Sequence, residues 1–390
     1  MTATRHILIV GGGIGGISAA IALAKTGRSV HVLEQSKEFK EIGAGIQIGP
    51  NAFKSFKALG VTDAVNGVAA FPDNLLVMDS VTGEQVTRMP AGEVFQKRFG
   101  NRYALIHRAD LHSVLLDAAR ASPLITLSAD KKMVSLHEKG DVVSIKMEGG
   151  EEYEGAALIG ADGLWSTVRQ TLVGDGKPRV SGHIAYRAVL PIAEVPKANL
   201  QNDMVLWAGE KTHLVHYPLR RGELFNLVAV FHSERYEEGW DSYGDPDELH
   251  LRFKAACPAV RGMLEKIESW RMWVLCDREP IRDWSRGRIT LLGDAAHPML
   301  QYLAQGACMA MEDAVCLAQK LDEAKGDFTS AFLAYQQARY LRTARVQLTA
   351  RLYGEVYHAS GATRDLRNAF LKSRTAEQSI ESMAWLYEGM

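Results

Sequence analysis

Hydrophobic positions in the first part of the chain fall in short continuous runs, each followed by a segment with helical spacing. Residues 7–10 read ILIV and lead into GGGIGG at 11–16, and residues 17–25 form an apolar segment rich in small residues. This order predicts a buried strand, a tight turn and a helix packed closely on a sheet. A second apolar run at 29–33 predicts the next strand of a parallel sheet.

The pattern changes between residues 182 and 273. Aromatic and β-branched residues gather there in HIAYRAVLPI, DMVLWAG, THLVHYPL and LFNLVAVF, which predict antiparallel strands of a separate sheet. In THLVHYPL, alternation places His213 and Tyr217 on one face and Leu214 and His216 on the other. We interpret this sheet as the layer that binds substrate.

The last third of the chain returns to the first pattern, with a strand in GRITLLG and helices over 306–317 and 328–353. An earlier helix is predicted over 107–119, with Asp110 as its N-cap and Arg108 just before it. We expect an α/β fold: a Rossmann-like nucleotide domain with strands of the other layer interleaved, an antiparallel substrate sheet, and C-terminal helices. The predicted segments are residues 1–181, 182–273 and 274–390. Arginines at 339, 342, 345 and 351 favour a solvated face of the last long helix.

The first glycine turn has the G-x-G-x-x-G spacing at Gly11, Gly13 and Gly16. Glycine lets a pyrophosphate approach the backbone at a helix N-terminus, where free N–H groups and the helix dipole favour an anion. Glu34 ends the next strand about 20 residues further on, where an acid accepts a hydrogen bond from a ribose hydroxyl. The spacing predicts a dinucleotide with an unphosphorylated ribose; a glycine turn without a ligand is the alternative.

Two more strand-to-turn junctions, GADG at 160–163 and GDAAHP at 293–298, follow the same logic. Open α/β sheets bind ligands at the carboxyl ends of their strands, and a long dinucleotide spans all three junctions. We expect Asp294 to accept a hydrogen bond from a ribityl or ribose hydroxyl, with an N-cap role as the alternative. The helix that opens near Gly306 would direct N–H groups at a flavin pyrimidine. The three motifs together predict FAD, bound by Gly11, Gly13, Ile14, Gly15, Gly16, Glu34, Gln47, Arg108, Asp162, Asp294, Gly306 and Ala307.

Composition narrows the class of partner. The chain has 390 residues, 47% of them hydrophobic, with 45 basic against 46 acidic side chains. This balance leaves no broad positive field of the kind that nucleic-acid binding uses, so a small-molecule partner is expected. The four cysteines form no C-x-x-C pair, which predicts buried thiols and no metal site. No apolar run reaches about 18 residues, so we expect no transmembrane helix and a cytoplasmic enzyme.

GGGIGG with Glu34, Arg108 before a helix, GADG, and GDAAHPMLQYLAQGACMAMEDA at 293–314 resemble the single-component flavoprotein aromatic hydroxylases, whose fold is typified by para-hydroxybenzoate hydroxylase. The resemblance covers nearly the whole chain. It implies non-covalent FAD, NADH or NADPH as a reductant without a Rossmann domain of its own, and O₂ as oxidant through a flavin C4a-hydroperoxide. A small aromatic acid is the implied substrate, and a homodimer is a further expectation.

Gln301, His213 and Tyr217 narrow the resemblance to the 3-hydroxybenzoate 6-hydroxylases, whose product is gentisate. Gln301 stands where family members acting on salicylate or 6-hydroxynicotinate usually carry proline, and Gln47 stands where the latter tend to carry histidine. The resemblance implies that His213 removes the proton of the substrate phenol, while Tyr217 and Gln301 hold the phenol or the carboxylate. A phenol titrates near about 10 and a free histidine near about 6.5, so such a base operates at neutral pH and makes the ring electron-rich.

Several alternatives stay open on the sequence. The same flavin chemistry fits a salicylate 1-hydroxylase that releases CO₂, or a 6-hydroxynicotinate 3-monooxygenase. A flavin oxidase or dehydrogenase would reduce its flavin with substrate alone. A nucleotide-binding module without catalysis is the fourth interpretation, and in each case His213 could instead be a satisfied polar group of the core.

Overall fold

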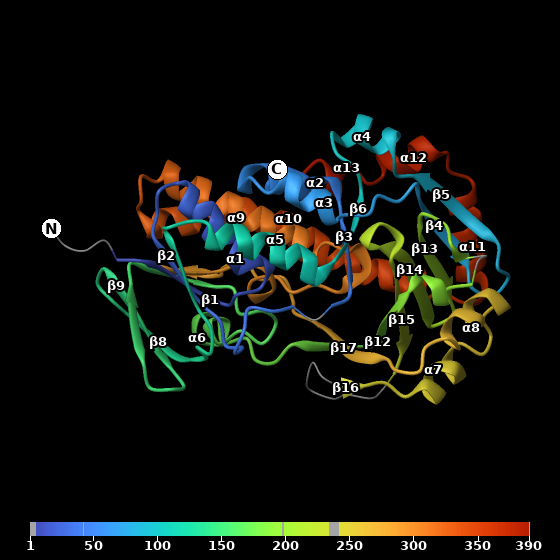
Figure 1. The fold of residues 1–390 in the computed structure, drawn as a ribbon, viewed down its shortest axis with the longest axis horizontal. Helices are drawn as coiled ribbons and strands as arrows, with labels where there is room; N and C mark the ends of the chain where they lie inside the picture. The colour runs from blue at the N-terminus through green and yellow to red at the C-terminus, as the bar shows by residue number, and fades with distance from the viewer. Residues whose placement is uncertain (1–4, 42, 197–198, 234–241, 390) are drawn as a thin grey trace.

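The computed structural model describes residues 5–41, 43–196, 199–233 and 242–389, and two large sheets organise it (Figure 1). The first sheet has six strands in the order β18-β19-β11-β1-β2-β7. All neighbours in it run parallel except the edge strand β18, which is antiparallel to β19. The strands are β1 Ile7–Val10, β2 Val30–Leu33, β7 Ile125–Ser128, β11 Ala157–Gly160, β18 Ser285–Arg286 and β19 Ile289–Leu291.

Four helices pack along this parallel sheet, as Figure 1 shows. Every residue of the first helix from Gly16 to Ala24 is buried, because its small side chains allow close packing against the sheet and a second helix. The four are α1 Ile14–Lys25, α5 Arg108–Arg120, α9 Gly306–Glu323 and α10 Phe328–Tyr357. Strand, turn and helix therefore follow one another as the apolar runs of the sequence predicted.

The second sheet has eight strands in the order β16-β17-β12-β15-β14-β13-β4-β5. Its neighbours are antiparallel except for β13 and β4, which run parallel. The strands are β4 Asn74–Asp79, β5 Gln85–Pro90, β12 Arg179–Pro191, β13 Asp203–Gly209, β14 Thr212–Leu219, β15 Leu224–His232, β16 Ser242–Tyr243 and β17 Arg271–Asp277.

The two faces of this sheet bury different partners. On one face, Leu214 and Phe231 pack with Leu249 and Val260 of helices α7 Pro246–Arg252 and α8 Pro258–Leu264. On the other, Val215 and other inward residues pack toward α9 and α10. The alternation predicted for THLVHYPL is thus the one that the core requires.

Smaller elements complete the described chain. A three-stranded sheet is formed by β8 Met133–Lys139, β9 Val142–Met147 and β10 Glu152–Gly155, and a two-stranded one by β3 Gly45–Ile48 and β6 Ala104–His107. The remaining helices are α2 Pro50–Leu59, α3 Thr62–Val68, α4 Glu93–Phe99, α6 Thr167–Leu172, α11 Gly361–Lys372, α12 Ala376–Glu381 and α13 Ala384–Tyr387.

The predicted α/β class with interleaved strands is confirmed, and one capping prediction is wrong. Helix α5 begins at Arg108 with His107 as N-cap, because β6 runs directly into it. Asp110 lies inside its first turn and forms an ion pair with Arg220 at 2.7 Å. The boundaries predicted at residues 181 and 273 fall inside β12 and β17.

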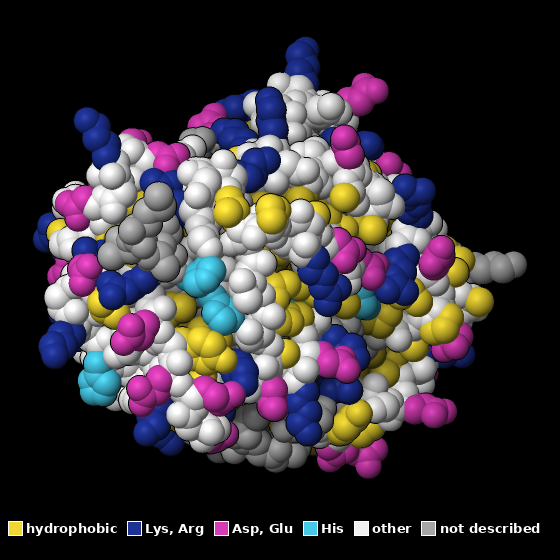
Figure 2. All heavy atoms as spheres, turned by 60° about the vertical axis from the view of Figure 1, so that its left-hand side comes forward, with side chains coloured by type: hydrophobic (Ala, Val, Ile, Leu, Met, Phe, Trp, Pro, Cys, Tyr) yellow, Lys and Arg dark blue, Asp and Glu magenta, His cyan; other side chains and the backbone are white. Residues whose placement is uncertain are grey.

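The surface charge, the cysteines and the helix lengths bear on the partners predicted from composition. On the face in Figure 2, basic and acidic side chains are interspersed, without one large patch of either sign. All four cysteines are free; three are buried and Cys276 is partly exposed. Within the described ranges, no helix combines the length and apolar character needed to span a bilayer.

Candidate active site

The three glycine motifs meet at the carboxyl end of the parallel sheet. Gly11 follows β1 with φ +109°, and a Cβ there would lie 2.2 Å from the carbonyl oxygen of Ala161. A Cβ on Gly15 would lie 3.0 Å from Cδ2 of Leu292 and 3.2 Å from Cβ of Ala310. Glycine permits these approaches, which join the first turn to the second and third motifs.

Two long helices present uncapped N-termini to this junction. Gly13 precedes α1 and Gln305 precedes α9, and neither N-cap residue supplies a side-chain hydrogen bond. Their first-turn N–H groups therefore remain for an anion, which the helix dipole also favours. A pyrophosphate at α1 and the negative charge of a reduced flavin pyrimidine at α9 fit these two ends.

Glu34 holds the first turn from the end of β2. Its carboxylate accepts hydrogen bonds from the backbone N–H of Gly12 at 2.7 Å and of Ser36 at 2.8 Å. Arg108 lies at the start of α5 and pairs with Glu41 at 2.9 Å. A Cβ on Gly13 would lie 3.5 Å from the carboxylate of Glu41. Glu41 therefore lies between Arg108 and the glycine turn.

The two predicted aspartates have different surroundings. Oδ1 of Asp294 would lie 3.7 Å from a Cβ on Gly306, which places the carboxylate beside the N-terminus of α9. Asp294 is exposed, yet the protein around it raises the pKa of its carboxyl by desolvation. Asp162 accepts hydrogen bonds from Oγ of Ser166 and, at 3.1 Å, from the backbone N–H of Val168. Its carboxylate thus orders the start of α6.

The eight-stranded sheet brings Tyr217 against strand β3, which holds Gln47. The side chain of Asn226, opposite Tyr217 in register, accepts a hydrogen bond from the N–H of Gly45 at 2.7 Å. A Cβ on Gly45 would lie 2.6 Å from the Tyr217 hydroxyl. Burial raises the pKa of Tyr217, opposed by Arg187 and by a hydrogen bond with Gln47. Glycine at position 45 thus makes room for a neutral phenol.

Arg187 lies on the same face of the sheet. It is opposite Val228, which is opposite Val215, so its guanidinium shares a face with Tyr217 and His213. Nη2 of Arg187 donates a hydrogen bond to the side chain of Gln301, and its Cζ lies 5.3 Å from the ring centre of Trp273. Burial lowers the pKa of Arg187 to about 10, which leaves it charged at neutral pH.

Arg187 and Trp273 line a cavity of about 590 Å³ between the 43–44 loop and the sheet. A guanidinium at a cavity wall is suited to a carboxylate, because its fork of donors matches the two oxygens. Arg187 was not among the residues predicted to bind substrate. The available signal was an arginine in the middle of an otherwise apolar strand, AYRAVL.

His213 lies on this same face, two residues before Val215 along β14. It is opposite Val230, which in turn is opposite Ala185. It is 3% exposed, and its Nδ1 forms a hydrogen bond with Nε2 of His358 at 2.7 Å. Burial, with a smaller effect of His183, lowers the pKa of His213 to about 3. The imidazole is therefore neutral at pH 7, and it accepts a proton less readily than a free histidine does.

A family model described as "FAD binding domain" matches residues 4–349. The 3-hydroxybenzoate 6-hydroxylase of Polaromonas naphthalenivorans (strain CJ2) is 46% identical over 381 residues, covering 98% of this chain and 95% of that protein. The chain belongs to the FAD-binding aromatic hydroxylases.

Two further members of the family support this placement. The 3-hydroxybenzoate 6-hydroxylase of Klebsiella oxytoca is 45% identical, with 99% of this chain and 97% of that protein covered. The structure of Klebsiella pneumoniae HpxO complexed with FAD and uric acid superposes with a TM-score of 0.88 at 26% identity, over 100% of this chain and 98% of that one. FAD binding, predicted from the three motifs, is confirmed at the level of the family.

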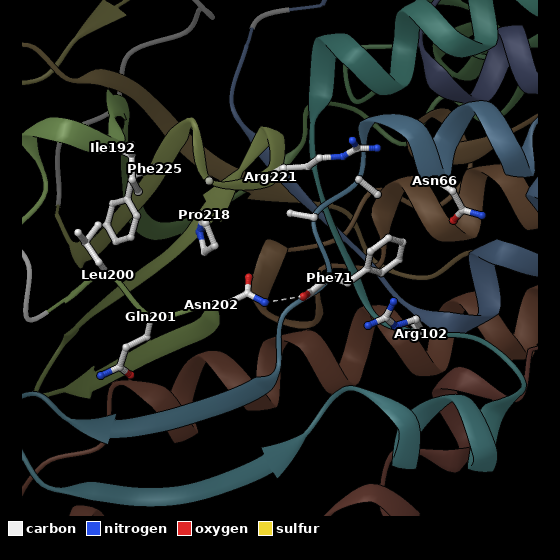
Figure 3. Close-up of a pocket in the computed structure, with 13 residues that line it drawn as sticks. Asn66, Phe71, Arg102, Ile192, Leu200, Gln201, Asn202, Pro218, Arg221 and Phe225 are labelled. Carbon is white, nitrogen blue, oxygen red and sulfur yellow. Dashed lines mark hydrogen bonds between the residues drawn. The ribbon is translucent and has the colours of Figure 1, made fainter.

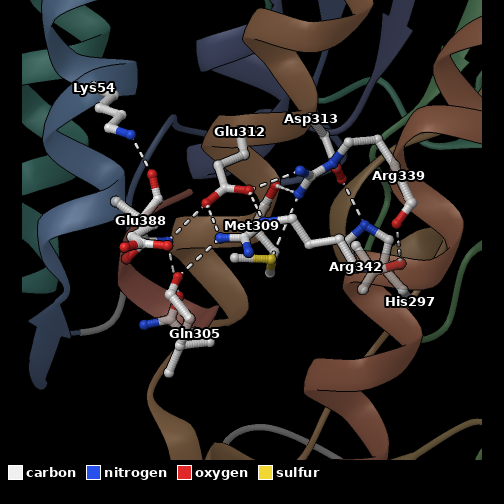
Figure 4. A network of polar contacts seen from close by, with 12 residues as sticks. Lys54, His297, Gln305, Met309, Glu312, Asp313, Arg339, Arg342 and Glu388 are labelled. Atoms are coloured by element: carbon white, nitrogen blue, oxygen red, sulfur yellow. Dashed lines mark hydrogen bonds and ion pairs between the residues drawn. The ribbon is translucent and has the colours of Figure 1, made fainter. Parts of the chain in front are cut away.

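Helix α9, whose N-terminus is predicted to face the flavin, is anchored by buried charges (Figure 4). Arg339 on α10 forms ion pairs with Asp313 at 2.6 Å and Glu312 at 2.7 Å, both on α9. Asp313 also accepts hydrogen bonds from the N–H of Gly293 and from His297. These contacts fix the GDAAHP turn against α9, which gives His297 a structural role.

The solvated face predicted for the arginines of α10 is wrong at Arg339, which is fully buried. Its partners Glu312 and Asp313 lie on α9, so the spacing of arginines along α10 carries no information about them. Arg345 is exposed, as the pattern predicted.

A second cavity, of about 680 Å³, lies where α3 approaches the connection between β14 and β15 (Figure 3). Asn66, Arg102 and Arg221 are among its lining residues. Arg221 donates a hydrogen bond to the carbonyl of Gly67 at 3.0 Å and closes one side. The residues predicted to bind FAD or substrate do not line it.

Proposed function

We propose that the chain hydroxylates 3-hydroxybenzoate para to its phenol and releases gentisate, with NADH as the electron donor. One atom of O₂ enters the ring and the other leaves as water, while NADH becomes NAD⁺ and one proton is consumed. Bound FAD supplies the reduced ring that activates O₂. The relatives named 3-hydroxybenzoate 6-hydroxylases support this substrate at 45–46% identity over nearly the whole chain.

The observation that carries the proposal is the polar face formed by Arg187, Tyr217 and Gln301, of which Arg187 lines the cavity. Arg187 binds the substrate carboxylate, since it is charged, lies at a cavity wall and is fixed by Gln301. Tyr217 hydrogen-bonds the substrate phenol or carboxylate from the other end of the face. Polar contacts at two points discriminate strongly between ring isomers, because a misplaced hydroxyl leaves buried groups unpaired.

His213 takes the phenol proton in this proposal. Nδ1 of His213 is hydrogen-bonded to His358, so Nε2 remains for the substrate. The phenolate is more electron-rich than the phenol, which favours attack on the carbon para to it. The eight-stranded sheet and strand β3 exclude water from the ring in this proposal.

The deciding experiment mixes FAD-loaded protein with NADH, air and one aromatic acid. We expect 3-hydroxybenzoate to accelerate NADH oxidation and to give one gentisate per NADH consumed. Salicylate and NADPH are run in parallel. Catechol with CO₂ from salicylate, or no gentisate from 3-hydroxybenzoate, contradicts the proposed substrate, whereas a faster rate with NADPH changes only the assigned reductant.

A further inference from the structure

Three histidines from separate parts of the chain meet beside His213. His183 on β12 and His232 on β15 stand directly opposite each other across an antiparallel pair, with ring centres 4.2 Å apart. His358, the C-cap residue of α10, completes the group. One ring nitrogen from each of the three lies within 4.8 Å of the other two.

The outer nitrogens of two of these rings are already held by other side chains. Nδ1 of His183 is hydrogen-bonded to the hydroxyl of Tyr302, and Nε2 of His358 is hydrogen-bonded to Nδ1 of His213 at 2.7 Å. Histidines that bind metals are oriented in the same way, by a partner on the nitrogen that does not face the ion. The nitrogens left to face one another are Nε2 of His183, Nε2 of His232 and Nδ1 of His358.

The spacing and charge of these nitrogens suit an ion. Nε2 of His232 and Nδ1 of His358 are 3.0 Å apart and share one hydrogen bond. When an ion binds, the proton of this bond moves to the other nitrogen of its ring, so both imidazoles stay neutral and His358 donates from Nε2 to His213. A free histidine titrates near about 6.5, so an unprotonated imidazole is available at pH 7. Neutral imidazole is the form that binds metal.

We propose that His183, His232 and His358 form a binding site for one divalent transition metal ion of the Zn²⁺ or Cu²⁺ type. Imidazole ligands select these ions over Mg²⁺ and Ca²⁺, which prefer oxygen. His183 and His358 are buried and His232 is partly exposed, so the ion enters past His232 and keeps an open position there. Once bound, the ion cross-links β12, β15 and the end of α10 directly behind His213.

The test titrates ZnCl₂ into FAD-loaded protein that carries no polyhistidine tag and has been treated with chelator. We expect calorimetry to report one ion per chain. His232→Gln and His183→Gln each remove a ligand and should weaken binding by more than the roughly tenfold loss typical of an altered outer partner. His137→Gln is the matched control, because His137 is exposed on β8, outside the cluster.

A spectroscopic readout keeps the proposal testable if a variant fails to fold. Cu²⁺ bound to the unmodified protein should show an electron paramagnetic resonance spectrum with hyperfine coupling to three imidazole nitrogens. Absence of saturable Zn²⁺ binding, equal affinity in the two ligand variants and the control, or a spectrum without multiple nitrogen ligands overturns the site. None of these results depends on whether 3-hydroxybenzoate is the substrate.

Discussion

Arg187 donates a hydrogen bond to the side chain of Gln301 and so connects the middle of the eight-stranded sheet to the turn that follows GDAAHP. The link crosses from the antiparallel sheet to the third cofactor motif. It places a fixed positive charge where the two layers of the molecule meet. In the proposed function, both the sheet and the cofactor layer would hold a negatively charged ligand at this position.

Replacing Arg187 tests whether its guanidinium binds the substrate carboxylate. Arg187→Gln should raise KM for 3-hydroxybenzoate about ten- to a hundredfold, because a hydrogen bond to a charged group contributes about 1.5–3 kcal/mol. FAD content should be unchanged, since the glycine motifs are untouched. Steady-state kinetics and the flavin absorbance give both quantities.

Arg282→Gln serves as the control for Arg187, because Arg282 is an exposed arginine before β18. If Arg187→Gln lowers kcat while KM stays at the parent value, the guanidinium acts in the chemical step and does not anchor the carboxylate. Loss of FAD in the variant would place Arg187 among the cofactor contacts.

His216 on β14 predicts an acid-sensitive stability. It is 4% exposed, and its Nε2 accepts a hydrogen bond from Nε1 of Trp207 at 3.0 Å, so protonation would set one donor against another. Burial lowers the pKa of His216 from 6.5 to about 3. Between these two values the unfolded chain binds the extra proton, so the stability that His216 contributes is full above pH 6.5 and declines as the pH falls.

The variant His216→Gln isolates this effect, because an amide oxygen still accepts from Trp207 but does not titrate. Relative to the parent, the free energy of unfolding of the variant should rise by about 2 kcal/mol between pH 7 and pH 5. Urea unfolding in excess FAD measures it. The free energy of unfolding of the exposed variant His137→Gln should depend on pH as that of the parent does. If His216→Gln also shows the pH dependence of the parent, His216 is protonated equally in the folded and the unfolded state.

Asp294 should govern retention of FAD. Asp294→Ala removes the carboxylate beside the N-terminus of α9 and should weaken FAD binding about tenfold or more, as expected for a lost hydrogen bond to a charged group. Flavin fluorescence, followed while FAD is titrated into apoprotein, gives the dissociation constant of FAD. Asp117→Ala, on the exposed side of α5, should bind as the parent does, and an equally tight Asp294→Ala removes Asp294 from the FAD contacts.

Arg339 should govern stability. Arg339→Met leaves Asp313 and Glu312 buried with reduced compensation, and breaking such a pair costs about 3–5 kcal/mol. Chemical denaturation of FAD-loaded protein is the measurement. Gln337→Met, exposed on the same helix, should change the free energy of unfolding little. Similar unfolding midpoints for the two variants would show that the charge network is not stabilising.

The parts of the fold that local pattern determines were predictable. Gly11 needs a positive φ and close approach to Ala161, so the glycine itself marks the turn. Alternation in β14 put His213 and Tyr217 on the face opposite His216, as hydrophobic cores on both sides of a sheet demand. The proximity of the three motifs at the ends of β1, β11 and β19 followed from the same logic, whereas their individual contacts with FAD stay a prediction.

The parts that depend on tertiary partners were not predictable. Arg187 is one of 45 basic residues, and nothing near it in the sequence reveals Gln301 or Trp273 as neighbours. Asp110 looked like an N-cap because no pattern shows that a strand continues into α5 without a loop. The histidines beside His213 come together only through the pairing of β12 with β15 and the length of α10.

The parallel pairing of β4 with β13 has a consequence for how the chain folds during synthesis. The β4–β5 hairpin leaves the ribosome more than a hundred residues before β13, so its inner edge stays open until that strand arrives. Residues 182–273 likewise lack two strands of their sheet when they are made alone. The eight-stranded sheet is therefore completed late in translation. A cut between the predicted segments would yield two pieces with exposed strand edges, and neither piece would fold as an independent domain.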